Sequence, residues 1–370
     1  MSERREIRAG VSLSLSGRFR LQGRAALNGI RLWVEYARPL LPLRLTVYDD
    51  GSRADRLREN VLRLLTRDRV DLLLGPYSSA LTMAAADIAE AHGKVLWNHG
   101  GASDAITEQG WRRLVTIVSP ASDYLRSLPL LIRRRDPEAR RVRILQGGTG
   151  TFGAHVARGV AEGAKAAGFS EIRIDRSDAL MSRSPSVVGD AALGQAEVLV
   201  GAGSFDDDVE MVRKAVRSPR LTCLAVVAAG LRAFHREAGE SAEGVIGPSQ
   251  WEPGVLNSPV AGPDSAWFVS EYRKRFDDVP EYVAAQAFAV GVVFAECLRR
   301  AGGLEDDRLL AAARELDLTT FFGRFKLDPE TGRQIGHQTV LVQWQEGEKL
   351  IIWPEARAGA ELRYPLPASG

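Results

Sequence analysis

Short apolar runs alternate with longer amphipathic segments along most of the chain, and this alternation restricts its fold more than any other feature. Segments with the helical spacing of apolar residues separate the first strand-like runs, which lie at 7–15, 43–48, 71–75, 95–97 and 114–118. After Ser119-Pro120 the pattern restarts, with predicted strands at 142–145, 171–175, 198–201 and 223–227. Helices are predicted in this second series at 123–134, 154–167, 186–193 and 206–216. Two such series predict an α/β protein with two doubly wound, Rossmann-like parallel sheets.

The order of elements changes beyond Gly247-Pro248. Two consecutive helices are predicted at 263–276 and 281–301, and the second is apolar on nearly every side, so it should be well buried. Strands of the antiparallel type are predicted after them, at 321–327, 338–345 and 350–353.

The composition is that of a soluble globular protein. The chain has 370 residues, which is enough for two domains with full cores, and 45% of them are hydrophobic. Its 49 basic and 47 acidic residues leave a net charge of +2, which gives no electrostatic reason to expect nucleic acid as a partner. The two cysteines, Cys223 and Cys297, are widely spaced and are predicted to be buried thiols.

No apolar run approaches the roughly 20 residues that a membrane helix needs. The N-terminus leads directly into the first predicted strand, without a hydrophobic segment for secretion. We therefore expect either a cytoplasmic protein or a mature form whose leader has been removed.

Two neighbouring predicted strands end in loops of small residues. The run at 71–75 leads through Gly75-Pro76 to Ser78 and Ser79, which precede an alanine-rich helix, and the run at 95–97 leads to 100–103, Gly-Gly-Ala-Ser. Open α/β folds bind ligands at the carboxyl edge of the sheet, where both loops should lie. Free backbone N–H groups, a helix N-terminus and serine hydroxyls would suit a carboxylate or phosphate. The alternative is that Ser78 and Ser79 only cap the helix.

A second motif suggests a different function. The segment 148–153, Gly-Thr-Gly-Thr-Phe-Gly, matches G-x-G-x-x-G after a predicted strand, and Asp175 follows at the spacing of a dinucleotide fingerprint. An NAD-dependent enzyme is therefore an alternative. Against it, the motif opens the second series, and no hydride-transfer partner stands out among the scattered histidines His92, His99, His155, His235 and His337. Other common catalytic and metal motifs are missing, so we expect no enzyme activity, no cofactor and no metal.

Several short motifs together resemble those of a known family. They include 14–17 with Gly23, Asn28-Gly29, Asp49-Asp50, 75–79, 101–103, Phe152-Gly153, 328–337 and Gln343-Trp344. In this order the chain resembles the type I periplasmic solute-binding proteins of the leucine/isoleucine/valine-binding class, over essentially its whole length.

The resemblance implies two lobes joined by three crossovers, with the ligand in a cleft between the lobes. The crossovers should fall near Ser119-Pro120, Pro248–Trp251 and Gly323–Asp328. The first lobe would then contain residues 1–119 and 249–325, and the second lobe residues 120–248 and 326–370.

The resemblance also implies a function. Such a protein captures a small carboxylate, such as a branched-chain amino acid or an aromatic or aliphatic acid, and delivers it to the permease of an ABC transporter. It would work in the periplasm or at the cell surface, as a monomer or a dimer. A cytoplasmic ligand-sensing regulator of the same fold is the alternative.

The residues that match the family's ligand contacts come from both lobes. In the first lobe a hydroxyl at Ser79 and the loop at Gly101, Ala102 and Ser103 would hold the ligand carboxylate. The resemblance places additional ligand contacts at Tyr77, Gln22, Phe152 and Phe205.

One position departs from the family pattern. Amino-acid binders carry a carboxylate for the ligand ammonium where this chain has Ala229, just before Gly230. A buried ammonium without a countercharge is costly. We therefore expect a carboxylate ligand with an apolar or aromatic body and no amine, unless Asp206 or Asp207 supplies the missing charge.

Overall fold

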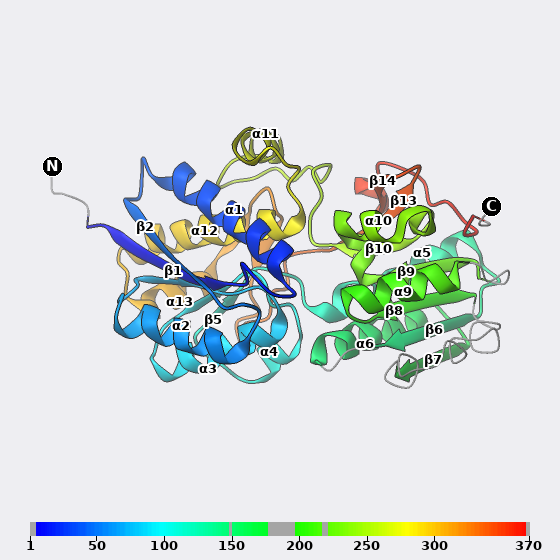
Figure 1. Ribbon diagram of the computed structural model, residues 1–370, viewed down its shortest axis with the longest axis horizontal. Coiled ribbons are helices and arrows are strands. Elements are labelled where there is room, and N and C mark those ends of the chain that lie inside the picture. The colour runs from blue at the N-terminus through cyan, green and yellow to red at the C-terminus, as the bar shows by residue number, and fades with distance from the viewer. Residues whose placement is uncertain (1–4, 148–149, 177–196, 217–220, 368–370) are drawn as a thin grey trace. The chain divides into compact units, whose positions relative to one another are not determined.

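The computed structural model describes residues 5–147, 150–176, 197–216 and 221–367, and its chain forms two compact units (Figure 1). Unit 1 comprises residues 1–120 and 255–338, and unit 2 comprises residues 121–254 and 339–370. The helix predicted at 186–193 lies outside the described residues.

Unit 1 is built on a five-stranded parallel sheet with the strand order β2-β1-β3-β4-β5. Its strands are β1 (Ile7–Leu13), β2 (Leu43–Asp49), β3 (Leu72–Leu74), β4 (Leu96–Asn98) and β5 (Leu114–Thr116). The strands β3 and β4, which have a neighbouring strand on each side, are fully buried, and this explains why they appear in the sequence as short continuous apolar runs. A separate two-stranded hairpin is formed by β11 (Asp317–Thr319) and β12 (Arg324–Lys326).

Helices cover both faces of the unit 1 sheet (Figure 1). One layer contains α1 (Arg20–Ala37), α12 (Tyr282–Ala301) and α13 (Asp306–Glu315), with α11 (Ser265–Phe276) packed on α1. The other layer contains α2 (Ala54–Thr66) and α3 (Ser79–Ala91), followed by the short α4 (Ala105–Glu108). By length and composition the helix α12 could cross a membrane, although the sequence suggested no segment of that kind. In the structure, however, 78% of its most apolar 18-residue stretch is buried.

Unit 2 has a seven-stranded sheet with the order β14-β13-β10-β9-β8-β6-β7. Its five parallel strands are β6 (Arg141–Gln146), β7 (Glu171–Arg176), β8 (Val198–Ala202), β9 (Cys223–Val226) and β10 (Ile246–Ser249). The last two strands, β13 (Val340–Gln345) and β14 (Glu348–Trp353), join this sheet in antiparallel pairs. The two predicted parallel sheets are therefore confirmed, and Cys223 and Cys297 are both free and buried, as expected.

The helices of unit 2 also form two layers. In one layer α5 (Leu128–Arg135) packs on α6 (Thr151–Ala166), and in the other α9 (Phe205–Ala215) packs on α10 (Arg232–Ala238). Short 3-10 turns complete the unit at η1 (Ala121–Asp123), η2 (Val227–Gly230), η3 (Gly239–Ala242) and η4 (Glu355–Arg357).

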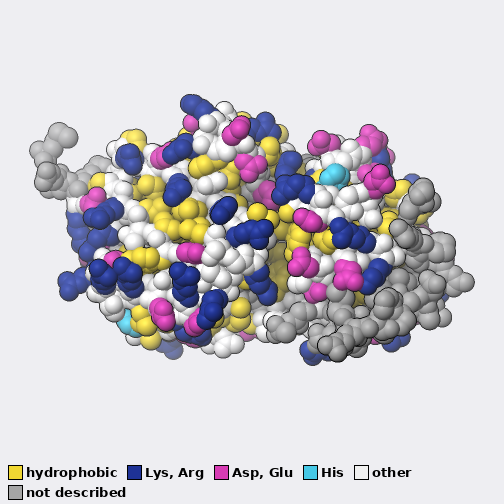
Figure 2. All heavy atoms as spheres, in the orientation of Figure 1, with side chains coloured by type: hydrophobic (Ala, Val, Ile, Leu, Met, Phe, Trp, Pro, Cys, Tyr) yellow, Lys and Arg dark blue, Asp and Glu magenta, His cyan; other side chains and the backbone are white. Residues whose placement is uncertain are grey.

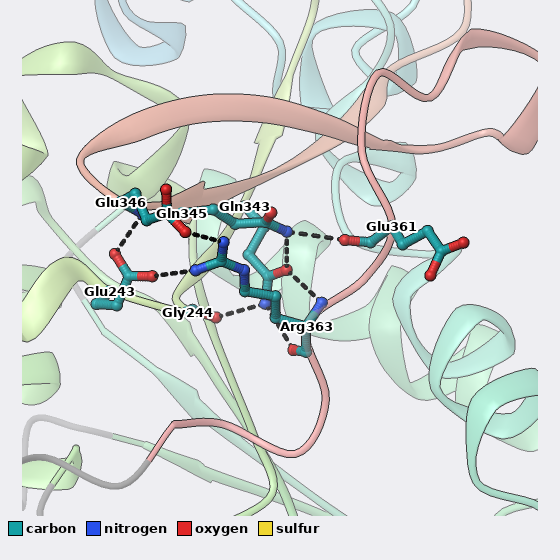
Figure 3. Close-up of polar contacts among 7 residues, drawn as sticks. All are labelled: Glu243, Gly244, Gln343, Gln345, Glu346, Glu361 and Arg363. Carbon is teal, nitrogen blue, oxygen red and sulfur yellow. Dashed lines mark hydrogen bonds and ion pairs between the residues drawn. The ribbon is translucent and has the colours of Figure 1, made fainter.

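Buried amides attach the C-terminal segment to unit 2 (Figure 3). Nε2 of Gln343 donates to the carbonyl oxygens of Gly244 at 2.9 Å and Arg363 at 3.0 Å, and its Oε1 accepts from the N–H of Arg363 at 2.9 Å. Nε2 of Gln345 donates to the carbonyl oxygen of Glu361 at 2.8 Å. The segment after β14 is thus an ordered part of this unit.

Two borders between the lobes were predicted incorrectly. Residues 326–338 belong to unit 1, where Nε2 of Gln334 donates to the carbonyl oxygen of Ile117 at 3.1 Å and the Ser119 hydroxyl lies 2.7 Å from Nδ1 of His337. Residues 249–254 belong to unit 2, because Gln250 bonds to the Tyr124 hydroxyl at 3.0 Å. The border positions depend on these long-range contacts, which the local sequence does not reveal.

Candidate functional site

The two serines at the start of α3 have different roles. Ser78 is the N-cap, and its hydroxyl oxygen accepts a hydrogen bond from the N–H of Leu81 at 3.4 Å. Ser79 instead faces the loop that follows β4: its hydroxyl oxygen accepts from the N–H groups of Ala102 at 3.2 Å and Ser103 at 2.9 Å. Capping alone therefore explains Ser78 but not Ser79.

This geometry determines what the Ser79 hydroxyl can offer a ligand. A hydroxyl has one proton to donate and two lone pairs that accept. The oxygen of Ser79 already accepts two N–H groups, so the group still available is its proton. Two donated bonds also polarise the O–H bond, because linked hydrogen bonds strengthen one another. A ligand atom that meets Ser79 must therefore be an acceptor, and a carboxylate oxygen is the strongest acceptor of this kind.

The backbone N–H groups of the second loop are not free, which corrects the expected anion cradle. In addition to the two bonds to Ser79, the N–H groups of Gly100 and Gly101 donate to Oδ1 of Asn98 at 3.1 and 2.8 Å. Nδ2 of the same side chain donates to the carbonyl oxygen of Gly101 at 2.8 Å and to Oγ1 of Thr116 at 3.2 Å. The fully buried Asn98 thus holds the loop in shape. Its signal in the sequence is an amide at the end of a strand, two residues before the glycine pair Gly100-Gly101, and this signal was missed.

Close packing explains why Gly101 must be a glycine. A Cβ atom placed there would lie 2.5 Å from Oγ1 of Thr82 and 2.7 Å from Cδ1 of Ile106. Thr82 is one turn into α3 and fully buried, so it could not move away cheaply. The loop after β4 therefore lies directly against the first turns of α3.

Tyr77 and Gln22 are the other unit 1 residues that were predicted to contact a ligand. Tyr77 forms an isolated parallel bridge with Gly100, so it lies next to the same loop, and its ring meets Phe19 edge-on at 6.0 Å. Burial raises the pKa of the Tyr77 phenol, while a hydrogen bond with Tyr282 opposes that shift, so the phenol is neutral near pH 7. Gln22 lies in the first turn of α1 and is half-buried.

His99 was considered only as a scattered histidine, but it lies within the same loop. Its side chain is completely buried, and burial lowers its pKa to about 4. The imidazole is therefore neutral near pH 7 and adds no positive charge next to Ser79.

Two predicted aromatic contacts begin helices of unit 2. Phe152 is the second residue of α6, and its ring meets Tyr124 edge-on at 5.3 Å. Phe205 is the first residue of α9, and it packs partly buried against the core of unit 2. Both follow carboxyl ends of parallel strands, β6 and β8, the edge at which open α/β sheets bind ligands.

The prediction of Ala229 as a ligand contact is not supported by its position. Its side chain is fully buried in the core of unit 2, and a Cβ atom on Gly247 would lie 2.9 Å from its Cβ. Its carbonyl oxygen accepts a hydrogen bond from Nε1 of Trp344 at 2.9 Å. Residues 227–230 form the 3-10 turn η2, which directs this side chain into the core.

The carboxylates at the start of α9 have distinct environments. Asp207 forms a capping box with Ser204, while Asp206 is exposed. The next residue, Asp208, is buried and accepts hydrogen bonds from the N–H groups of Gly203 at 3.0 Å and Ala228 at 2.9 Å. Burial raises its pKa to about 7, although these N–H groups favour the charged form. Of the two candidates for a substitute countercharge, Asp206 is the more exposed, because Asp207 is partly buried and caps α9.

The structure gives little support to the dinucleotide motif. Gly148 and Thr149 lie outside the described residues. Asp175, the residue expected to bind a ribose, instead accepts from Nε of Arg143 and from Nε of Arg173, both at 2.8 Å. Within the described residues there is also no group of three or more His, Cys, Asp or Glu that could hold a metal ion.

Comparison with protein families finds a match over most of the chain. The model of a family described as periplasmic binding protein matches residues 6–349. A curated relative from Brucella melitensis, called Leu/Ile/Val-binding protein homolog 8, is 22% identical over 385 residues, which cover 97% of this chain and 93% of the relative. A second relative, Leu/Ile/Val-binding protein homolog 7 from Brucella abortus, is 21% identical over 383 residues, which cover 97% of this chain and 94% of the relative.

Solved structures share the fold at low sequence identity. A leucine-binding protein from Thermotoga maritima has a TM-score of 0.81 with 17% identity, covering 93% of this chain and 97% of that one. A branched-chain amino acid transporter substrate-binding protein from Streptococcus pneumoniae, solved in complex with isoleucine, has a TM-score of 0.77 with 16% identity, covering 98% and 100%.

Proposed function

Because the chain belongs to the periplasmic binding protein family, we propose that it is the solute-binding protein of an ABC transporter and that its solute is a small carboxylate with an apolar or aromatic body. The observation that carries the ligand class is the Ser79 hydroxyl, which accepts two backbone N–H groups and keeps only its proton to offer. The ligand carboxylate would accept that proton as a hydrogen bond.

The proposal assigns contacts in both units, following the resemblance in sequence. Ser79 would donate its proton to the carboxylate, and Tyr77, Gln22 and the loop 101–103 would lie beside it, because the N–H groups of that loop already bond to Asn98 and Ser79. Phe152 and Phe205 would contact the apolar body of the ligand, since their rings are only partly buried in unit 2. Binding of this kind needs no covalent step, so we expect no catalysis by this site.

The ligand could belong to either of two classes, amino acids or carboxylates without an amino group. The names of the relatives, and the isoleucine in the Streptococcus pneumoniae structure, favour a branched-chain amino acid. A ligand without an amine would need no countercharge, and Ala229 supplies none, because its side chain lies in the core of unit 2. If the ligand is an amino acid, Asp206 is the candidate partner for its ammonium, because Asp207 caps α9 and Asp208 is buried.

A permease partner and a location outside the cytoplasmic membrane are part of the same proposal. Both follow from the family, whose members deliver solutes to membrane transporters. The solute would be captured outside the membrane and released at the permease.

A thermal-shift screen tests the proposed function. A ligand bound only by the native state raises its melting temperature, by an amount that grows with ligand concentration. We expect stabilisation by carboxylates with aliphatic or aromatic bodies and none by their primary amides or alcohols. Leucine, isoleucine and valine should be tested beside the matching acids without the amine. Stabilisation by NAD(H) alone, with no response to any carboxylate, would overturn the proposal.

A further inference from the structure

Positive charge is concentrated in the first part of unit 1. The segment 18–70 contains twelve arginines and only six acidic residues, whereas the whole chain has a net charge of only +2. The rest of the chain is therefore slightly acidic. Figure 2 shows that Lys and Arg side chains predominate over Asp and Glu on the face of this unit that it presents.

Four of these arginines form a stripe along α1. Arg20, Arg24 and Arg31 lie in the helix and Arg38 caps its C-terminus, at intervals of four, seven and seven residues. These intervals place them on one side of a helix of 3.6 residues per turn. All four are exposed, opposite the buried face that contains Ile30. We call these four residues the arginine stripe.

No acidic residue neutralises the arginine stripe within the described part of the chain. The one acidic residue of α1, Glu35, pairs with Arg275 of α11 at 3.4 Å. Asp49 and Asp50 are held by serine hydroxyls and backbone N–H groups near the end of β1. Asp55 pairs with its neighbour Arg53 at 2.6 Å. Within the described residues, none of the four arginines of the stripe is held in an ion pair, so their guanidinium groups remain available at the surface.

Exposed apolar side chains accompany this charge. Leu21 is 50% exposed in the first turn of α1, and Leu40 is 68% exposed just beyond its end. Arginines beside exposed leucines are the combination by which helices bind the interface of anionic membranes, because the guanidinium groups reach phosphates while the leucines enter the acyl boundary.

We propose that the α1 face of unit 1, formed by the arginine stripe with Leu21 and Leu40, docks on the headgroups of anionic phospholipids. This would hold the protein at the membrane that contains its permease. The inference rests on the proposed location outside the cytoplasmic membrane but not on the identity of the solute. A nucleic acid or an acidic protein would engage the arginines, but neither would account for the leucines.

Co-sedimentation with lipid vesicles tests this inference. The purified chain should sediment with vesicles of phosphatidylcholine and phosphatidylglycerol and remain in solution with phosphatidylcholine alone. Each basic residue near an anionic surface contributes roughly a fivefold increase in partitioning. The variant Arg20→Gln/Arg24→Gln/Arg31→Gln/Arg38→Gln should therefore partition at least about tenfold more weakly. Binding should also weaken as the salt rises to about 0.15 M.

A matched variant controls for loss of charge. Arg135, Arg236, Arg273 and Arg308 are exposed arginines outside the stripe, and changing all four to glutamine removes the same charge. Glutamine and arginine have similar helix propensities, so both variants should fold, which equal melting temperatures and an unchanged ligand response would verify. The proposal is wrong if the unchanged protein ignores anionic vesicles at low salt, or if the two variants lose binding equally. Salt-dependent binding to DNA without binding to vesicles would assign the charge to another partner.

Discussion

The single hydroxyl group of Ser79 joins the start of α3 to one loop, through the N–H groups of two residues that lie 23 and 24 positions later in the sequence. The serine at position 78, one residue earlier, is the cap, and its φ of 90° is one that residues with a side chain rarely adopt. Such strain is kept where the surrounding structure requires it, often at binding sites. Sequence could predict that both strand ends carry hydroxyls and glycines, but not which serine faces the other loop, since this depends on one backbone angle. Asn98 and Asp208 were missed for a related reason, because each also bonds to a distant segment, Asn98 to Oγ1 of Thr116 and Asp208 to the N–H of Ala228.

The stability of unit 1 should depend on His99 in acid. An unfolded histidine titrates near 6.5, whereas burial lowers the pKa of His99 to about 4. Between these values the unfolded state binds more protons, so the stabilising contribution of the neutral ring is complete above about 6.5 and is lost as pH falls toward 4. We expect the free energy of unfolding to fall less steeply between pH 7 and about 4.5 in His99→Gln than in the unchanged protein. Urea melts at pH 7 and at about pH 4.5 would measure this difference. An equal loss of unfolding free energy in the two proteins would refute the prediction.

The helices and strands follow the sequence pattern where packing is local and depart from it where packing is not. The five parallel strands of unit 1 begin and end within two residues of the predicted bounds, because each is an apolar run bounded by turn residues. The helix predicted at 123–134 instead begins at Leu128, after the turn η1. Pro129 lies in its first turn, where the backbone N–H that a proline lacks would have no partner within the helix. Of the predicted strand 321–327, only residues 324–326 form a strand, β12, which pairs with β11 in a hairpin. Nη2 of Arg324 lies 2.6 Å from Asp317 across this hairpin, a pairing that no local pattern reveals.

The C-terminal segment should stabilise unit 2 but not unit 1. Deleting residues 361–370 removes the carbonyl partners of the buried Gln343 and Gln345, and also Leu366, which packs on the core of unit 2 (Figure 3). A buried donor left without its partner costs about 1–3 kcal/mol. We expect hydrogen exchange to become faster in β13 and β14 and to stay unchanged in β1 to β5.

Deleting only residues 368–370, which keeps all of these contacts, is the matched control for that experiment. It should exchange like the full chain throughout. Faster exchange in both units of the longer deletion, or in neither, would contradict the assignment of this segment to unit 2.

At the scale of the whole molecule, two units with separate cores could be predicted because the strand and helix alternation occurs twice. The chain crosses between the units three times, and the exact crossing points depend on contacts between distant segments, such as that of Ser119 with His337. Membership of the family indicates the solute-binding function, and the carboxylate class of the ligand is our proposal from the chemistry at Ser79. The central claim of our proposal is therefore that the site captures a carboxylate.

Calorimetric titration of the ligand found by the thermal screen tests this central claim most directly. Ser79→Ala removes the proton that we propose the carboxylate accepts, and a hydrogen bond to a charged group is worth about 1.5–3 kcal/mol. We predict that this variant binds the carboxylate about tenfold to a hundredfold more weakly. Ser78→Ala, which removes only the helix cap, should lower the melting temperature and keep the affinity. Equal affinity in Ser79→Ala and the unchanged protein would contradict the account.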